Sequence, residues 1–150
     1  MNEIRFGLVI VALDGSAFAE RALPIACSIV RQAGNAGQVK LVHVHDRGAF
    51  AANAPAVDST WENERAGEMG LELTKTAARW AAETNLNVTA VVLRGRAAES
   101  ISAYAIEHCA DLVVMTTHGR SGLKRALVGS VTEEVLRTAR TPVLVVPASE

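Results

Sequence analysis

The sequence predicts an α/β fold, an open parallel sheet of five strands with helices on both of its faces. Three observations carry this prediction. Short apolar runs end at turn residues, segments of helical period lie between these runs, and the two kinds alternate strictly along the chain. Continuous apolar runs rich in branched residues are typical of strands buried on both faces. Parallel strands need a crossover between them, usually a helix, so the alternation favours a parallel sheet.

Each element follows from its own pattern. The strands are expected at residues 6–13, 39–45, 86–93, 111–116 and 142–147, where the apolar runs lie. Apolar residues recur every three or four positions between them, which predicts helices at about residues 23–30, 66–80, 97–108 and 130–138. Residues 46–59 show no clear period, and residues 117–128 are Gly-rich and basic. Both segments are predicted as loops, and the first is long enough to be a candidate lid.

Length and composition restrict the function. The 150 residues suit one domain over the whole chain, residues 1–150. A net charge of −1 and 4% aromatic residues argue against a nucleic-acid partner, which requires excess Lys and Arg or stacking aromatics. No apolar run approaches a membrane span, and the N-terminus lacks the pattern of a signal peptide. We therefore expect a cytoplasmic protein with no membrane association.

The sequence predicts no metal site. Cys27 and Cys109 lack the spacing of a zinc site, and both are expected to be buried thiols. His43 and His45 are expected on opposite faces of their strand, which would keep them from binding one ion together. The acidic residues between positions 58 and 68 are interpreted as a solvated helix face.

Candidate binding residues follow the first and fourth predicted strands. In open parallel sheets, ligands bind beyond the carboxyl ends of the strands. Asp14 ends the first strand and could accept hydrogen bonds from ribose hydroxyls. Gly119, nine intervening residues and the pair Gly129–Ser130 follow the fourth strand, and Ser130 would begin a helix whose N-terminus attracts anions. The intervening residues include the cations Arg120, Lys124 and Arg125.

Structural interpretations of the same residues remain open. Ser130 and Glu133 form a Ser-x-x-Glu pattern, a capping box that would serve helix stability alone. Asp14 could cap the first helix, and the glycines could mark turns. The basic residues could be a solvated surface. The joint placement of all these residues at the ends of two strands favours the functional interpretation.

Three segments resemble the universal stress protein family: residues 10–16 (IVALDGS), residues 111–122 (DLVVMTTHGRSG) and residues 129–147, from Gly129-Ser130-Val131 to the last strand. The likeness covers nearly the whole chain. It implies a Rossmann-like sheet of order 3-2-1-4-5 and a homodimer. The last strand, Val143 to Val146, is apolar and is expected at a sheet edge, where it could pair with a second copy.

One branch of that family binds ATP through a motif of Gly, two residues, Gly, nine residues, then Gly and Ser or Thr. Gly119 and the pair Gly129–Ser130 match it, whereas Thr116 stands at the first glycine position. Ala12 stands where the family often has proline. The resemblance implies a binding site on these residues: Ala12, Asp14, Val44 and Met115 on the adenine side, Gly119, Gly129, Ser130 and Val131 on the phosphate side, with Thr116 and Arg120 beside them.

The favoured function is an ATP-binding regulatory module of the stress response, with ATP, and Mg²⁺ as its counter-ion, at the ends of strands one and four. The alternative is a stress protein that binds no nucleotide and acts through protein–protein contacts, with its crevice blocked around Thr116. The P-loop motif and the dinucleotide-binding motif are both missing from the sequence, and no catalytic residue is identified. An enzymatic role, if any, would be slow ATP hydrolysis.

Overall fold

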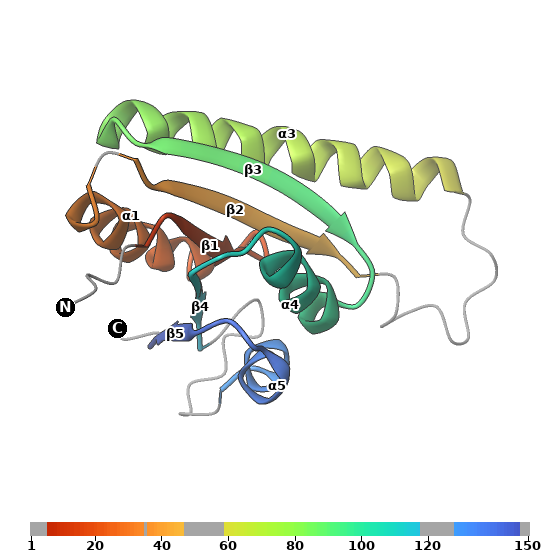
Figure 1. Cartoon of the computed structure of the whole chain (residues 1–150). Coiled ribbons are helices and arrows are strands. Elements are labelled where there is room, and N and C mark those ends of the chain that lie inside the picture. Colours follow the sequence, from red (N-terminus) through yellow and green to blue (C-terminus); the bar gives the residue numbers. More distant parts are fainter. Residues whose placement is uncertain (1–5, 35, 47–58, 118–127, 148–150) are drawn as a thin grey trace.

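The computed structural model of the chain describes residues 6–34, 36–46, 59–117 and 128–147. Strands and helices alternate within these residues, as the pattern of apolar runs predicts (Figure 1). The elements in chain order are β1 (Leu8–Ala12), the short 3-10 helix η1 (Ala19–Arg21), α1 (Ala22–Gln32), β2 (Gln38–His45), α3 (Ser59–Thr84), β3 (Asn87–Arg94), α4 (Ala97–Glu107), β4 (Leu112–Thr116), α5 (Ser130–Thr138) and β5 (Val143–Val146).

All five strands form one parallel sheet in the order β3-β2-β1-β4-β5. This confirms the expected α/β fold and strand order. The order reverses between β1 and β4, because β2 and β3 lie on one side of β1 and the later strands on the other. Such a reversal leaves a crevice at the carboxyl ends of the two central strands. β5 lies at one edge, as its sequence predicts.

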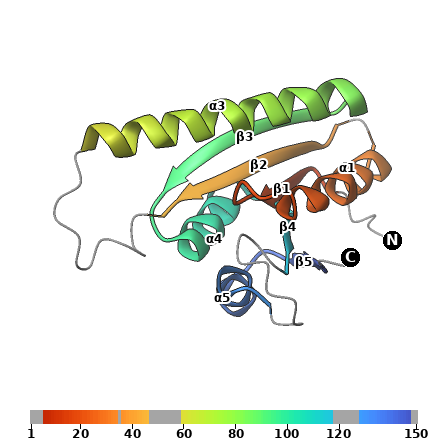
Figure 2. The ribbon, with the colours of Figure 1, turned by 180° about the vertical axis from the view of Figure 1, so that it is seen from behind.

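Helices cover both faces of the sheet (Figures 1 and 2). On one face, α1 and α3 pack through side chains such as Leu23 and Leu73 against Val9, Val11 and Leu41. On the other face, α4 and α5 pack through Ile101 and Val135 against strand residues that include Ile10 and Val113. The central strands are therefore buried from both sides, which explains their continuous apolar sequences.

At the amino end of the sheet, the carboxylate of Asp111 connects the start of β4 to the start of β1. Asp111 precedes β4, and its Oδ2 accepts hydrogen bonds from the backbone N–H groups of Gly7 (2.8 Å) and Leu8 (2.9 Å) at the start of β1. The backbone N–H of Asp111 donates to the Leu8 carbonyl at 2.9 Å. The side chain thus connects the two central strands at the end opposite the crevice.

The two cysteines differ from the expectation. Cys27 on α1 is buried, and burial raises the pKa of its thiol above the ordinary value. Cys109 is exposed, so the prediction of a buried thiol is wrong at that position. The reason is local: α4 ends before Cys109, which takes a left-handed backbone conformation (φ 51°) beyond the helix. Its side chain therefore leaves the apolar stripe on which Ile101 and Ala105 lie.

No helix in the described residues is both long enough and apolar enough to cross a membrane. The longest, α3, has 26 residues. Its described part buries one stripe, Ala66, Leu73 and Ala77, and exposes much of the rest of its surface. This amphipathic pattern is that of a helix packed on a sheet.

Candidate functional site

A cavity of about 320 Å³ lies at the carboxyl ends of β1, β2 and β4. Eight residues predicted from the sequence line it: Ala12, Asp14, Val44, Met115, Thr116, Gly129, Ser130 and Val131. They come from three strands, the turn after β1 and the start of α5. The fold therefore brings together residues that are up to 119 positions apart in the sequence, Ala12 and Val131.

On the β1 side, Asp14 lies in a tight turn. Its Oδ1 accepts a hydrogen bond from the backbone N–H of Ser16 at 2.9 Å, and Gly15 between them has a φ of 85°, which favours glycine. Ser16 Oγ accepts a bond from the N–H of Ala19 at 3.2 Å, at the start of η1. The Asp14 carboxylate thus stabilises its own turn. The hydrogen bond with the first residue of η1 is made by the Ser16 side chain and not by Asp14.

On the opposite side, α5 begins at the cavity. Gly129 is its N-cap residue and no side chain caps the helix, so the capping-box interpretation of Ser130 is wrong. Ser130 is the first helical residue and lines the cavity instead. The first N–H groups of a helix have no acceptor within it, so this end of α5 can offer donors to an anion.

Two hydrogen bonds attach the start of α5 to the end of β4. Thr132 Oγ1 donates to the carbonyl oxygen of Thr116 at 3.0 Å, and the N–H of Gly129 donates to that of Thr117 at 2.6 Å. A Cβ on Gly129 would lie 3.1 Å from the same Thr117 oxygen. Gly129 therefore permits a close approach of the two segments that a larger residue would disturb.

Thr116 occupies the position of the missing glycine. It is the last residue of β4, pairs with Val146 of β5, and is buried beside the cavity. Its φ is not positive, unlike those of Asn85 and Cys109, the two non-glycine residues with positive φ in the described chain. A threonine can adopt this extended conformation, so the backbone here does not require glycine.

Some sequence predictions fall outside the described residues. Gly119 and Arg120 lie there, together with Lys124, Arg125 and most of the candidate lid, residues 47–58.

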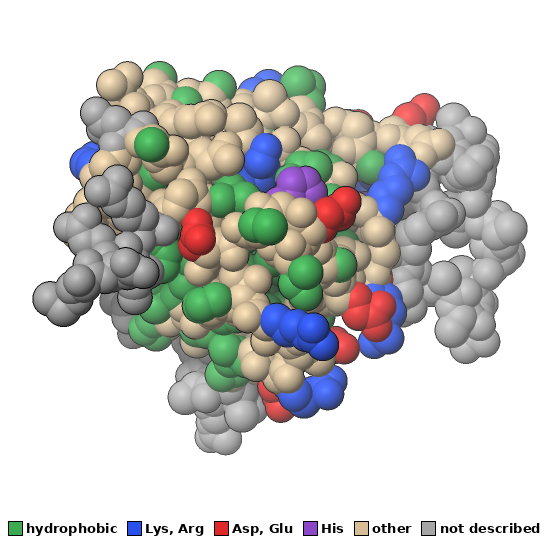
Figure 3. Space-filling view, in the orientation of Figure 1, with side chains coloured by type: hydrophobic (Ala, Val, Ile, Leu, Met, Phe, Trp, Pro, Cys, Tyr) green, Lys and Arg blue, Asp and Glu red, His purple; other side chains and the backbone are tan. Residues whose placement is uncertain are grey.

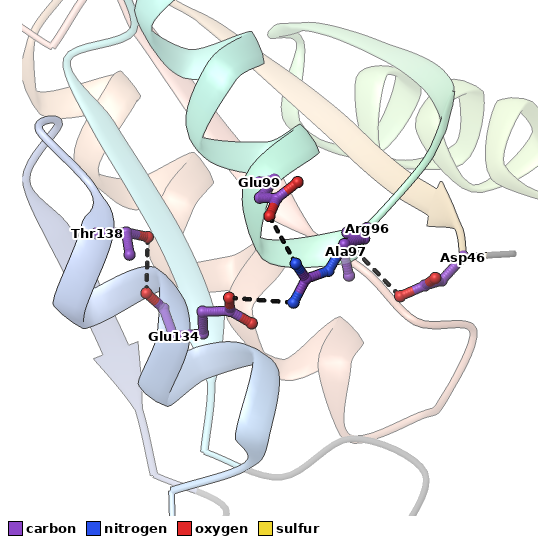
Figure 4. Close-up of polar contacts among 6 residues, drawn as sticks. All are labelled: Asp46, Arg96, Ala97, Glu99, Glu134 and Thr138. Carbon is purple, nitrogen blue, oxygen red and sulfur yellow. Dashed lines mark hydrogen bonds and ion pairs between the residues drawn. The ribbon is translucent and has the colours of Figure 1, made fainter. Parts of the chain in front are cut away.

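The third wall of the cavity comes from the start of α4, through Ala97 and Ile101. Asp46, directly after β2, accepts a hydrogen bond from the N–H of Ala97 through Oδ2 at 3.3 Å (Figure 4). Arg96 forms ion pairs with Glu99 at 2.9 Å and with Glu134 of α5 at 3.7 Å. Figure 3 shows basic and acidic side chains side by side over this region. These contacts connect the two helices that flank the cavity.

Sequence reasoning missed His43 as a residue of the site. His43 lines the cavity and is buried, with Nδ1 2.9 Å from the carbonyl oxygen of Leu13. The expectation that His43 and His45 face opposite sides is wrong, because residues two apart in the unbroken strand β2 share a face. The described residues contain no group of three or more His, Cys, Asp or Glu side chains able to hold a metal ion.

Two titratable groups among the described residues, Cys27 and Tyr104, have raised pKa values and lie away from the cavity. Burial raises the pKa of the Cys27 thiol, and burial followed by the nearby Glu107 charge raises the pKa of the Tyr104 hydroxyl. Neither residue is among those that line the cavity. The site as described is thus an apolar pocket with hydrogen-bonding groups at its two ends.

Comparisons with known proteins identify relatives of this chain. The profile described as the universal stress protein family matches residues 6–147. The universal stress protein MJ0531 of Methanocaldococcus jannaschii is 34% identical over 92% of this chain and 80% of its own length. The solved structure of hypothetical protein MJ0577, from the same organism, is 27% identical with a TM-score of 0.78, and covers 98% of this chain and 99% of that one.

Two other solved structures share the fold and contain nucleotides. A universal stress protein in complex with cAMP has a TM-score of 0.70 at 23% identity, covering 97% of this chain and all (100%) of that chain. A family protein from Arabidopsis thaliana with AMP bound has a TM-score of 0.65 at 20% identity, covering 93% and 90%. Together with the sequence match over nearly the whole chain, the sheet order and the placement of the motif residues, these findings show that the chain belongs to the universal stress protein family.

Proposed function

We propose that this chain is an ATP-binding regulatory module that holds the nucleotide in the cavity between the turn after β1 and the start of α5. One observation carries the proposal: eight residues that the family resemblance implies for an ATP site line a single cavity of about 320 Å³. That volume lies within the range of small-molecule sites, which is about 300–1,000 Å³.

The adenosine end of the nucleotide would lie near β1 and β2. Ala12, Val44 and Met115 offer an apolar surface for the base, and Asp14 offers a half-buried carboxylate for the ribose hydroxyls. A hydrogen bond to a charged acceptor contributes about 1.5–3 kcal/mol. Asp14 is therefore the polar residue of this end on which we expect affinity to depend most.

The phosphates would lie at the start of α5. The N–H groups at Ser130 and Val131 would face an anion with the positive end of the helix dipole behind them. Gly119 and Arg120 are proposed to complete this end through the loop after β4. Mg²⁺, which binds mostly through water and phosphate oxygens in nucleotide sites, would accompany the triphosphate.

The relatives support an adenine nucleotide as the ligand class. One structural neighbour is a complex with cAMP and another contains AMP. Both ligands share the adenosine part, which in this chain would meet the Ala12–Asp14 side of the cavity. The triphosphate is the finer part of the proposal and rests on the motif around Gly129 and Ser130.

Calorimetry tests the proposal directly. The purified protein, freed of bound nucleotide by unfolding and refolding, should bind ATP, and Asp14→Ala should weaken binding by at least about tenfold, since a charge-assisted hydrogen bond is lost. Glu83→Ala, an exposed acidic residue near the end of α3, is the matched control and should bind as the wild type does. No heat and no thermal shift at millimolar ATP would contradict the proposal.

The alternative is a family member that binds no nucleotide and acts through protein contacts. The buried side chain of Thr116 at the cavity wall is the feature that favours it. Chromatography of the supernatant after denaturation separates the two proposals. Adenine nucleotide at near one equivalent per chain supports the first, and its absence together with negative calorimetry supports the second.

We further propose that the chain forms a homodimer through β5. This strand is at the sheet edge, and its residues Val143, Leu144 and Val145 are half-buried and apolar. An unpaired edge with these side chains is suited to contact a second copy. Light scattering should give about twice the chain mass of 15.9 kDa, and a mass near that of one chain at micromolar concentration would contradict the dimer.

A further inference from the structure

His43 holds the backbone at the point where β1 becomes the turn of Asp14. The side chain is only 8% exposed, and its Nδ1 lies 2.9 Å from the Leu13 carbonyl oxygen. A carbonyl oxygen only accepts hydrogen bonds, so Nδ1 must carry the proton. The contact therefore fixes the tautomer as well as the orientation of the ring.

Leu13 lies one residue beyond the end of β1, and two bonds to β2 hold it there. Its N–H donates to the Val42 carbonyl at 2.9 Å, and its carbonyl accepts from His43. The carbonyl of Leu13 and the nitrogen of Asp14 belong to the same planar peptide group. A fixed carbonyl direction therefore sets the direction in which the Asp14 backbone leaves the sheet.

We propose that His43 is a positioning residue that acts through Leu13 to present Asp14 to the cavity. The proposal rests on the proposed function for its effect on ATP, but the geometry of the turn can be tested without ligand. Without the imidazole donor, the buried carbonyl of Leu13 would have to turn toward another donor. The Asp14–Ser16 turn, closed by the 2.9 Å bond from the Ser16 N–H, would then lose its fixed orientation.

Two substitutions separate the hydrogen bond from simple packing. In His43→Asn, the amide Nδ2 is attached to Cγ, as Nδ1 is in histidine, and can donate to Leu13. His43→Leu has the same branched arrangement of heavy atoms as Asn but no donor. If the hydrogen bond matters, Asn preserves the turn and Leu does not. If only apolar filling matters, the order is reversed.

The ligand-free measurement is amide hydrogen exchange at Ser16, followed by NMR. We expect exchange to be at least about tenfold faster in His43→Leu and within about threefold of wild type in His43→Asn, because local opening sets the exchange rate. The ¹⁵N shifts of His43 should show a protonated Nδ1. Equal protection in His43→Leu and wild type, or a neutral ring protonated only at Nε2, would overturn the proposal.

The second measurement is ATP affinity by calorimetry. His43→Leu should bind at least about tenfold more weakly, and His43→Asn within about threefold of wild type. In an Asp14→Ala background, His43→Leu should cause little further loss, since interacting positions are not additive. A full, additive loss in the double variant would overturn the route through Asp14. A wild type that binds no ATP would contradict the proposed function, while the exchange of Ser16 would still decide the role of His43.

Discussion

Two aspartates lie at opposite ends of the central strands and have different surroundings. Asp111, at the amino end, uses one oxygen to accept two backbone hydrogen bonds from β1, at 2.8 and 2.9 Å. Asp14, at the carboxyl end, accepts a bond from its own turn and lines the cavity. An aspartate side chain thus connects two strands at one end of the sheet, and another lines the cavity at the other end.

The difference follows from the geometry of parallel sheets. At the amino end, the chain enters neighbouring strands with unpaired N–H groups, which a carboxylate can satisfy. At the carboxyl end, the strand order reverses and the crossover helices leave in different directions, so a crevice forms. We therefore expect changes at the amino end to alter stability and changes at the carboxyl end to alter ligand affinity.

The largest effect on stability is expected for Asp111→Ala. The change removes two charge-assisted hydrogen bonds and leaves the partly buried N–H of Leu8 without this acceptor, so the free energy of unfolding should fall by about 1.5–3 kcal/mol. Asp111→Asn, which keeps one acceptor oxygen, should lose less. Urea denaturation measures both. If Asp111→Ala lowered the ATP affinity without lowering the free energy of unfolding, the expectation that the amino end of the sheet governs stability would be wrong.

A smaller effect is expected for Thr116→Gly, which restores the glycine of the family motif. Glycine in a strand should lower the free energy of unfolding by about 1 kcal/mol. Because Thr116 has no positive φ, we expect the ATP affinity to change by less than about threefold, which corresponds to about 0.65 kcal/mol. Denaturation and calorimetry measure the two quantities. A tenfold gain in affinity would instead show that the threonine side chain obstructs the cavity.

The smallest effect is expected for Arg96→Gln. The Arg96 side chain is 65% exposed, and such surface ion pairs contribute at most about 1 kcal/mol. Removing its link to Glu134 should lower thermal stability slightly, and less so in high salt. Lys75→Gln, which breaks the exposed pair with Glu72 on α3, is the matched control. A loss of ATP affinity in Arg96→Gln alone would indicate that the connection between α4 and α5 shapes the cavity.

The fold was predictable because its signals are local. Each central strand is buried on both faces, so its sequence is a continuous apolar run, and the helices between strands show their own period. The errors also have local causes. The apolar pattern of α4 does not reveal that the chain turns to positive φ at Cys109. The Ser-x-x-Glu pattern does not reveal that Gly129, and not Ser130, is the N-cap residue of α5.

The candidate site was predictable in part. Asp14, Gly129 and Ser130 could be found because they follow strand ends in a recognisable motif, and all three line the cavity. His43 could not be found in this way, because the two histidines of β2 form no spacing pattern that indicates a partner elsewhere in the chain. Its importance depends on the carbonyl of Leu13, which is 30 positions away in the chain.

The sequence by itself determined the class of fold, the order of elements and the motif residues, because periodicity and turn chemistry are properties of neighbouring residues. Only the tertiary structure decided which groups meet at the cavity and what each one does there. Hydrogen bonds such as His43 to Leu13, Thr132 to Thr116 and Gly7 to Asp111 depend on distances between segments that the chain order leaves open. For that reason two residues of the same type, Asp14 and Asp111, have different contacts at the two ends of one sheet.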